Sequence, residues 1–287
     1  MNSDCVNKAI GWQDSPFIAV VTWNGIVKLF DASSKQFVGE FSIHKNSGGV
    51  NVAISSNNKQ CFCGTYYAWG LACFDIGTGQ VVWHRKDLKR FYGLSFSKAR
   101  NSLFAYFNGK SAIELNPTTG ECLNSFRGVV EIHASPFDES LLLVDTKNFR
   151  LTDRSGDTLW SVQRESFAIL DVAWSQDTVA ISEVGADNPD GSKAGIRCFS
   201  LHGELLWRYK GQNTHVDPLQ FRQRTNSFIG VDFTSGEACL LVELDKDSGK
   251  VSHQKIVPSL PHWGFCQSAE QYFTVNHTSY EVTLEKF

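Results

Sequence analysis

Short apolar runs separated by polar turns follow one another along the whole chain, a pattern that is typical of β-strands. One recurring unit is an apolar run, a polar turn and a second apolar run, as in residues 10–22 (IGWQDSPFIAVVT) and 52–65 (VAISSNNKQCFCGT). Seven such units occur in the 287 residues. Six of them are followed by a second unit, in which a polar residue ends a strand and a turn, usually with glycine, leads into another strand. Each repeat therefore predicts four short strands.

The second unit has recognisable turn chemistry. Its turn-opening residues are spaced 44, 41, 37, 47 and 45 positions apart and are Asp31, Asp75, Asn116, Asp153, Ser200 and Asp245. Side chains of these types can bond to the turn backbone, and glycine supplies the positive φ that such turns need. The turn glycines are Gly79, Gly120, Gly156, Gly203 and Gly249. Four residues after three of these glycines stand Trp83, Trp160 and Trp207, whose rings we expect to pack between neighbouring repeats.

A repeat of about 40–45 residues with four strands is the signature of a β-propeller. We therefore predict an all-β fold: one domain over residues 1–287 that forms a seven-bladed β-propeller of four-stranded antiparallel blades. Because the seventh repeat stops where its turn should begin, and few residues precede the first strand, we expect the last blade to close with three strands.

Two stretches, residues 74–83 (FDIGTGQVVW) and 199–207 (FSLHGELLW), resemble the repeats of WD40 and quinoprotein-like (PQQ-type) proteins. The Gly-His and Trp-Asp signatures of WD40 repeats are absent. The resemblance implies a fold superfamily and specifies no function, because one fold hosts many functions. Quinoprotein dehydrogenases are exported and usually have larger propellers, so we expect no PQQ and no other cofactor.

Composition and charge limit the expected partners and the expected cellular compartment. The formal net charge of −3 offers no global basic field for a phosphate backbone, which disfavours general nucleic-acid binding. The chain does not start with basic residues followed by an apolar run, so we expect no secretory leader. It has no run of about 18 apolar residues, so we expect no membrane span. Most of the eight cysteines lie in apolar strand-like runs, so we expect free, buried thiols and a cytoplasmic protein.

Motifs for catalysis are missing from the sequence. It contains no phosphate-binding GxxxxGK[ST] loop, no HExxH and no GxSxG, so we predict no enzyme and name no catalytic residue. The alternative is a hydrolase or lyase that uses the central channel, where His133 on a predicted innermost strand is a candidate ligand or base. Four further histidines are predicted in or near rim loops, but different blades carry them, and we expect no metal site: His44, His215, His262 and His277.

Aromatic and basic residues gather in loops that the topology places on one rim. In a propeller, the loop between the two middle strands of a blade emerges on the same rim as the crossing to the next blade. Trp23 lies in such a loop of blade one, and Tyr66, Tyr67 and Trp69 lie in that of blade two. The crossing after blade two contributes Lys86, Lys89 and Arg90. Tyr and Trp are enriched at interface hot spots, although such residues also pack between blades.

The longest loop within a blade is acidic. Residues 183–195 (EVGADNPDGSKAG) join the middle strands of blade five and carry Glu183, Asp187 and Asp190. This segment is interpreted as a solvated insertion or as a partner contact, and we include Asp187 in the predicted binding surface. The ligand ladder of a calcium loop is tighter than this spacing, so calcium is not expected.

These observations favour a non-catalytic binding platform that engages a protein partner with an acidic surface. A scaffold, an adaptor or a stoichiometric inhibitor, such as a toxin-neutralising or immunity protein, would act in this way. We expect the protein to be a monomer on its own and not to bind a membrane. The enzyme remains one alternative, and binding of a small ligand or glycan through Tyr66, Tyr67 and Trp69 is another.

Overall fold

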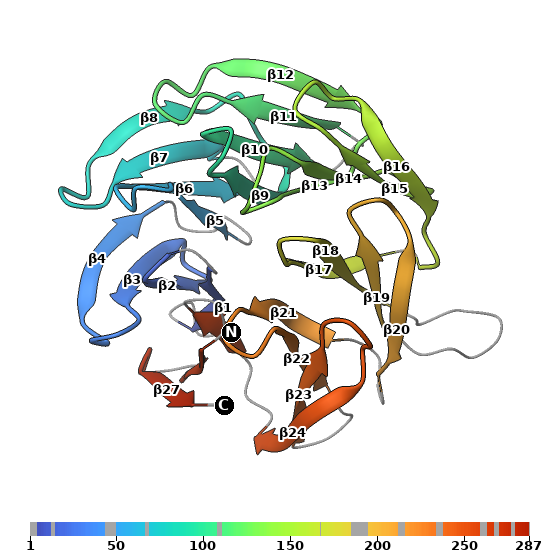
Figure 1. Ribbon diagram of the computed structural model, residues 1–287. Helices are drawn as coiled ribbons and strands as arrows, with labels where there is room; N and C mark the ends of the chain where they lie inside the picture. Colours follow the sequence, from blue (N-terminus) through green and yellow to red (C-terminus); the bar gives the residue numbers. More distant parts are fainter. Residues whose placement is uncertain are drawn as a thin grey trace.

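Seven small sheets surround a central axis. The computed structural model describes residues 5–12, 15–43, 50–66, 69–107, 111–166, 168–184, 195–211, 216–233, 238–258, 263–266, 270–276 and 279–286. Every regular element in these ranges is a β-strand. The strands form seven antiparallel sheets, each from consecutive strands, and Figure 1 shows the sheets as blades with the first strand of each facing the axis. The predicted seven-bladed β-propeller is confirmed.

Six blades have four strands. Blade one is β1 (Val6–Gly11), β2 (Phe17–Thr22), β3 (Ile26–Asp31) and β4 (Phe37–Ser42). Blade two is β5 (Val50–Ile54), β6 (Gln60–Thr65), β7 (Leu71–Asp75) and β8 (Val81–Arg85). Blade three is β9 (Phe91–Ser97), β10 (Ser102–Phe107), β11 (Ser111–Leu115) and β12 (Cys122–Arg127). Blade four is β13 (Glu131–Ala134), β14 (Leu141–Val144), β15 (Asn148–Thr152) and β16 (Thr158–Gln163).

The remaining blades complete the ring. Blade five is β17 (Ile169–Trp174), β18 (Thr178–Glu183), β19 (Gly195–Ser200) and β20 (Leu205–Lys210). Blade six is β21 (Val216–Arg222), β22 (Ser227–Phe233), β23 (Ala238–Asp245) and β24 (Val251–Pro258). Blade seven is β25 (Trp263–Cys266), β26 (Gln271–Val275) and β27 (Val282–Lys286). The expectation of a three-stranded last blade is confirmed.

Burial follows the position of a strand within its blade. The second strands, such as β2 (FIAVVT) and β18 (TVAISE), are buried along nearly their whole length because neighbouring blades cover both of their faces. The outermost strands alternate, as in β16, where Trp160 is buried between exposed neighbours. This difference explains why middle strands read as continuous apolar runs and outer strands as alternating ones.

The outer hairpin turns are built by the polar residues that the repeat pattern singled out. Asp31 accepts hydrogen bonds from the backbone N–H groups of Ser33 at 3.0 Å and Ser34 at 2.8 Å. Asp245 accepts one from the N–H of Ser248 at 2.8 Å. Hydrogen bonds from the Ser33 and Ser248 side chains hold the pKa of Asp31 and Asp245, respectively, below the usual aspartate value. The carboxylates thus replace backbone partners that a tight turn lacks.

The three tryptophans of the repeat seal neighbouring blades, as predicted. Each indole Nε1 donates to a backbone carbonyl in the outer turn of the next blade: Trp83 to Pro117 at 2.8 Å, Trp160 to Leu201 at 3.1 Å, and Trp207 to Lys246 at 2.6 Å. Each ring also lies against the glycine of that turn, so a Cβ at Gly120, Gly203 or Gly249 would clash with it. Where the tryptophan is replaced, at Gly39 and Asn124, the turn glycine of the next blade has open space beside it.

The ring closes through the inner strands of blades one and seven. A Cβ on Gly11 of β1 would overlap the backbone carbonyl of Phe265 in β25, so the two strands are in direct contact there. Farther out, the Lys28 ammonium lies over the Tyr280 ring, 4.4 Å from its centroid. Contact through β1 and β3 therefore joins the three-stranded blade to the start of the ring.

All eight cysteines are free thiols, and six of them are buried. Cys61 and Cys63 face the same side of β6, as their alternation predicted, with 3.6 Å between their Sγ atoms. Burial raises the pKa of the Cys73 and Cys198 thiols to about 12. Within the described ranges, no helix is long and apolar enough to cross a membrane.

Candidate functional site

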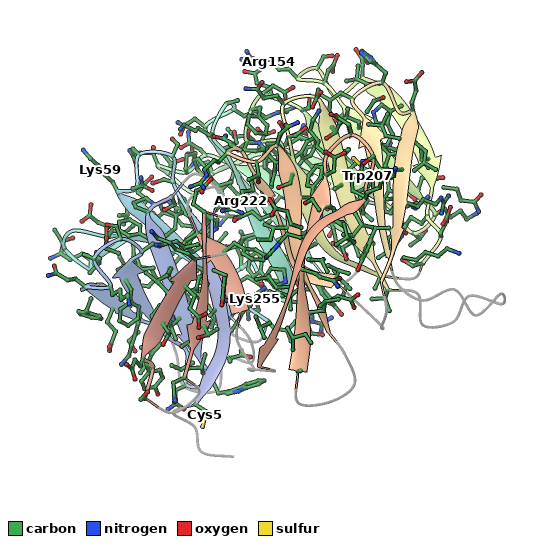
Figure 2. The ribbon with its side chains drawn as sticks, turned by 60° about the horizontal axis from the view of Figure 1, so that its bottom comes forward. Cys5, Lys59, Arg154, Trp207, Arg222 and Lys255 are labelled. Carbon is green, nitrogen blue, oxygen red and sulfur yellow. The ribbon has the colours of Figure 1, made fainter. Side chains whose placement is uncertain are left out.

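The two rims of the ring carry different connections. One rim holds the loops between second and third strands and the crossings between blades, and here the innermost strands begin. The other rim holds the turns between first and second strands and the outer hairpin turns. Figure 2 shows the contrast, with Cys5, next to the start of β1, at the bottom and Lys59 and Arg154, from turns of the second kind, toward the top. We call the rim with the crossings the entry rim.

On the entry rim, the aromatic loop of blade two meets the basic crossing that follows it. The N–H of Arg90 donates to the carbonyl of Tyr66 at 3.0 Å. The Tyr66 ring lies edge-on to Tyr92, with 5.9 Å between ring centroids. Tyr92 is 56% exposed. The structure therefore brings Tyr66 and Arg90 together, as the topology predicted, and places Tyr92 of β9 beside Tyr66.

The three predicted cations are available to solvent. Lys86, Lys89 and Arg90 are exposed and make no ion pair with any described residue. Arg85 differs, because its guanidinium donates to both carboxylate oxygens of Asp87 and, at 2.6 Å, to the carbonyl of Gly120. The bond from Arg85 holds the pKa of Asp87 below its usual value. Asp87 is thus neutralised locally, and the crossing presents a net positive charge.

Trp69 lies deeper than the partner-binding prediction assumed. Its ring stacks on Phe74 with 6.2 Å between centroids and lies 4.1 Å from the centroid of His84. His84 Nε2 is 2.8 Å from the carbonyl oxygen of Trp69. The side chain is half-buried and packs against the core between blades one and two. These contacts give Trp69 a role in holding the loop.

Trp23 lies in the equivalent loop of blade one. Its backbone N–H donates to the carbonyl of Cys5 at 3.1 Å, and its side chain is 45% exposed. The described contacts do not include one between Trp23 and the loop of blade two. Two predicted residues, Tyr67 and Asp187, lie outside the described residues, as do Asp190 and the rim histidines His44, His215, His262 and His277.

The acidic loop begins later than its sequence suggested. Glu183 was interpreted as part of a solvated loop, but it ends β18 and is only 5% exposed. Its carboxylate accepts from Arg197 Nε at 2.5 Å, and Arg197 is also 5% exposed. The Arg197 guanidinium lies over the rings of Phe149 and Phe199. The interpretation of Glu183 was wrong because an arginine on the neighbouring strand β19 pairs with it inside the blade.

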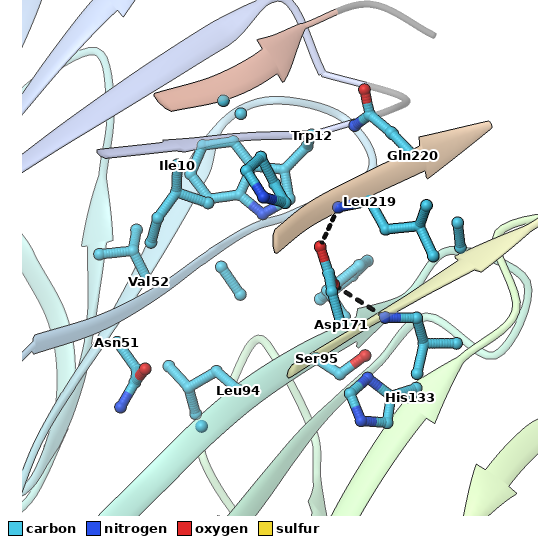
Figure 3. Close-up of a pocket in the computed structure, with 18 of the residues that line it drawn as sticks. Ile10, Trp12, Asn51, Val52, Leu94, Ser95, His133, Asp171, Leu219 and Gln220 are labelled. Atoms are coloured by element: carbon cyan, nitrogen blue, oxygen red, sulfur yellow. Dashed lines mark hydrogen bonds between the residues drawn. The ribbon is translucent and has the colours of Figure 1, made fainter. Parts of the chain in front are cut away.

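A second candidate site is the central cavity, which the inner strands enclose. It has a volume of about 600 Å³ and is lined by residues of all seven innermost strands. Figure 3 shows Ile10, Trp12, His133 and Asp171 among the side chains that face it. His133 lines this cavity, as predicted, and its Nε2 is 3.2 Å from the carboxylate of Glu131. The Tyr106 ring lies 6.4 Å from the His133 ring, centroid to centroid.

Two aspartates stand in the wall of this cavity. Asp171, in β17, accepts from the N–H of Leu219 in β21 at 2.8 Å and from the N–H of Val172 at 2.9 Å (Figure 3). Asp217, in β21, has no hydrogen-bond partner among the described residues. Burial, reinforced by the charge of Asp171, raises the pKa of Asp217 to about 7. Burial also raises the pKa of Asp171, although its two N–H partners oppose the shift.

Lys8 acts on both members of this pair, and the charge of His133 also lowers the pKa of Asp171. Lys8 lies on β1, lines the same cavity, and lowers the pKa of both aspartates. Sequence reasoning missed Lys8, Asp171 and Asp217. The available signal was a charged residue near the start of an innermost strand, as in residues 169–174 (ILDVAW) and 216–222 (VDPLQFR). His, Cys, Asp and Glu side chains in the described ranges form no group of three that could hold a metal ion.

Comparison with known proteins supports the architecture. No protein-family model matches the chain, and no curated protein matches it in sequence. Among solved structures, Kuenenia stuttgartiensis hydrazine synthase covers 100% of this chain at 12% identity, with a TM-score of 0.76 over 97% of that chain. The β-propeller domain of Myceliophteria thermophila Cps50 (Swd1) also covers 100%, at 10% identity, with a TM-score of 0.77 over 98% of that chain. This chain is a β-propeller.

A third similar propeller belongs to a crystal structure of the mitotic checkpoint complex. It covers 98% of this chain at 11% identity, with a TM-score of 0.77 over 87% of that chain. These likenesses agree with the β-propeller fold that residues 74–83 and 199–207 led us to expect. Identities this low establish the fold alone.

Proposed function

We propose that this propeller is a non-catalytic binding platform that engages a protein partner through its entry rim. The observation that carries the proposal is the surface formed by Tyr66, Tyr92, Lys86, Lys89 and Arg90, here called the Tyr66–Arg90 surface. It combines the exposed Tyr92 ring, packed on the partly buried Tyr66, with three cations that make no ion pair with a described residue. One of the similar propellers is part of the mitotic checkpoint complex, and a role in complexes is consistent with that likeness.

The surface has the composition of an interface with an acidic partner. Tyrosines bury a large area with few rotatable bonds, and hot spots are enriched in Tyr, Trp and Arg. Lys86, Lys89 and Arg90 would attract acidic groups and speed the encounter more than they tighten the complex. Trp23, in the equivalent loop of blade one, belongs to the same proposal, and Asp187, outside the described residues, stays a proposed contact from the acidic loop of blade five.

The proposed partner role includes a scaffold, an adaptor or a stoichiometric inhibitor. We infer that the protein acts as a monomer in the cytoplasm. The free thiols support a reducing compartment, because disulfides are rare there.

The test is affinity purification from the native host with three forms of the protein. Wild type should retain a specific partner, and the double variant Lys89→Glu/Arg90→Glu should lose most of it. Lys250→Glu, at an exposed outer turn of blade six, is the matched charge-reversal control and should retain the partner. Binding by the purified partner should then weaken by about 2 kcal/mol or more in Tyr92→Ala if Tyr92 is a hot spot. Equal retention by wild type, the double variant and Tyr92→Ala would place the interface elsewhere.

A further inference from the structure

The charges in the central cavity do not balance. Three carboxylates line it, those of Glu131, Asp171 and Asp217, against the single ammonium of Lys8. His133 lies beside Glu131 and so compensates one carboxylate when it is protonated. The two aspartates come from adjacent inner strands and repel each other, because the charge of Asp171 acts directly on Asp217. Like charges held close together are costly unless a cation lies near them.

Lys8 does not fully compensate the charge of the two aspartates. It makes no ion pair or hydrogen bond with any described residue, and its side chain is exposed. Asp217 likewise lacks a donor among the described residues, whereas Asp171 has two backbone N–H partners. The carboxylate of Asp217 is therefore a partly exposed acceptor that lines the cavity and has no hydrogen-bond partner among the described residues.

We propose that the central cavity binds a small organic cation, whose ammonium or guanidinium group lies against the carboxylates of Asp217 and Asp171. The cavity volume of about 600 Å³ falls within the range of small-molecule sites. Aromatic side chains of Trp12 and Tyr106 form part of its lining and can contact the ligand's carbon chain or its charge. This site is separate from the Tyr66–Arg90 surface, and its occupancy does not depend on the proposed partner.

Binding of a cation is linked to the proton on Asp217. A ligand cation favours the ionised carboxylate, so the pair releases a proton when the ligand binds at a pH below that group's pKa of about 7. Affinity for the ligand should therefore rise between pH 6 and pH 8. Lys8 lowers the affinity for the ligand, because its ammonium competes for the same carboxylates.

The experiment is calorimetric titration of the purified protein with putrescine, a diamine, at pH 6 and pH 8. The isosteric diol 1,4-butanediol and the dianion glutarate serve as ligand controls. We expect putrescine to bind, with higher affinity at pH 8, and the diol and glutarate not to bind. Putrescine affinity should fall at least tenfold in Asp217→Asn and lose its pH dependence. It should stay unchanged in Glu204→Gln, which removes an exposed carboxylate from an outer turn.

A second variant and a second probe sharpen the result. Lys8→Met removes the competing ammonium and should increase the affinity for putrescine. Nα-acetyl-lysine amide tests whether the cation is instead the side chain of a lysine on another protein; stronger binding of this probe than of putrescine identifies that source. The proposal is overturned if neither amine binds, if the diol binds as well as the diamine, or if Asp217→Asn and Lys8→Met both bind like wild type.

Discussion

Trp207 of blade five lies directly on Gly249 of blade six. A Cβ added to Gly249 would lie 2.5 Å from atoms of the indole ring, and the indole Nε1 donates to the neighbouring carbonyl of Lys246. Two features therefore disfavour any other residue at position 249: the φ of +66° and the indole ring that covers the glycine. The same relationship joins Trp160 to Gly203 and Trp83 to Gly120.

Substitution of Gly249 by alanine should destabilise the protein more than substitution of Gly79. Both residues have nearly the same backbone, with φ of +66° and +70°, but Gly79 has no atom within 4 Å of its added Cβ. Gly79→Ala should cost about 1–2 kcal/mol of unfolding free energy for its left-handed backbone. Gly249→Ala should cost at least about 1 kcal/mol more, since overpacking adds to that cost. Urea unfolding measures both, and equal losses would show that Trp207 moves aside freely.

Removal of the Trp207 ring should be among the most destabilising single changes. The side chain is 7% exposed and packs on Phe228. Trp207→Ala should lower the unfolding free energy by about 3–5 kcal/mol. Trp207→Phe keeps an aromatic ring but loses the bond to Lys246, so its loss should be clearly smaller. An alanine variant as stable as wild type in denaturant titrations would contradict the packing described here.

Asp217 should make the protein less stable as pH rises. Its pKa is about 7 in the folded protein and near 3.8 when unfolded, so the folded state binds the extra proton between these values. The favourable contribution is complete below about pH 4 and is lost as pH rises through 7. Asp217→Asn should therefore match wild type at pH 4 and exceed it at pH 8. The ceiling is about 4 kcal/mol, from about 1.4 kcal/mol per pKa unit, and solvent screening reduces it because Asp217 is partly exposed.

Asp31→Asn should change the pH dependence of stability in the opposite direction to Asp217→Asn. The pKa of Asp31 is lowered in the folded protein, chiefly by the Ser33 hydroxyl, so its contribution is present above the unfolded pKa and disappears as pH falls. This variant should be less stable than wild type at neutral pH and should approach it in acid. Thermal unfolding from about pH 2 to pH 8 separates the two signatures, because the Asp31 contribution disappears only below its unfolded pKa of 3.8. Identical pH profiles for both variants would refute the assignment for Asp217.

The thiols should fall into two groups toward a thiol reagent in the folded protein. Cys122 is exposed and Cys5 partly exposed, whereas the other six are buried. Burial raises the pKa of Cys266 to about 11 and that of Cys73 to about 12, which removes the reactive thiolate. We expect fast reaction at Cys122, slower reaction at Cys5, and close to eight thiols after denaturation without reductant. Rapid native reaction of Cys73 or Cys198 would contradict the burial.

Much of the architecture is determined by the sequence on its own, because a propeller repeats one local unit. The turn residues from Asp31 to Asp245, the glycines and the three tryptophans recur at nearly fixed spacing, and each acts within its own blade or on the next. Local hydrogen bonds and the alternation of burial can be predicted from the residues of one strand or turn. The blade count, the outer turns and the wedges at Trp83, Trp160 and Trp207 could therefore be predicted.

The sites depend on contacts that no local pattern encodes. Trp69 is half-buried because His84 and Phe74 pack against it from neighbouring strands. Glu183 is buried at the end of β18, and not exposed in the acidic loop, because Arg197 of β19 pairs with it. Asp171 and Asp217 meet because two inner strands lie side by side at the axis, and Lys8 reaches the same cavity from blade one. Closure of the ring alone decides which charges share a cavity, since electrostatic coupling depends on distance in space.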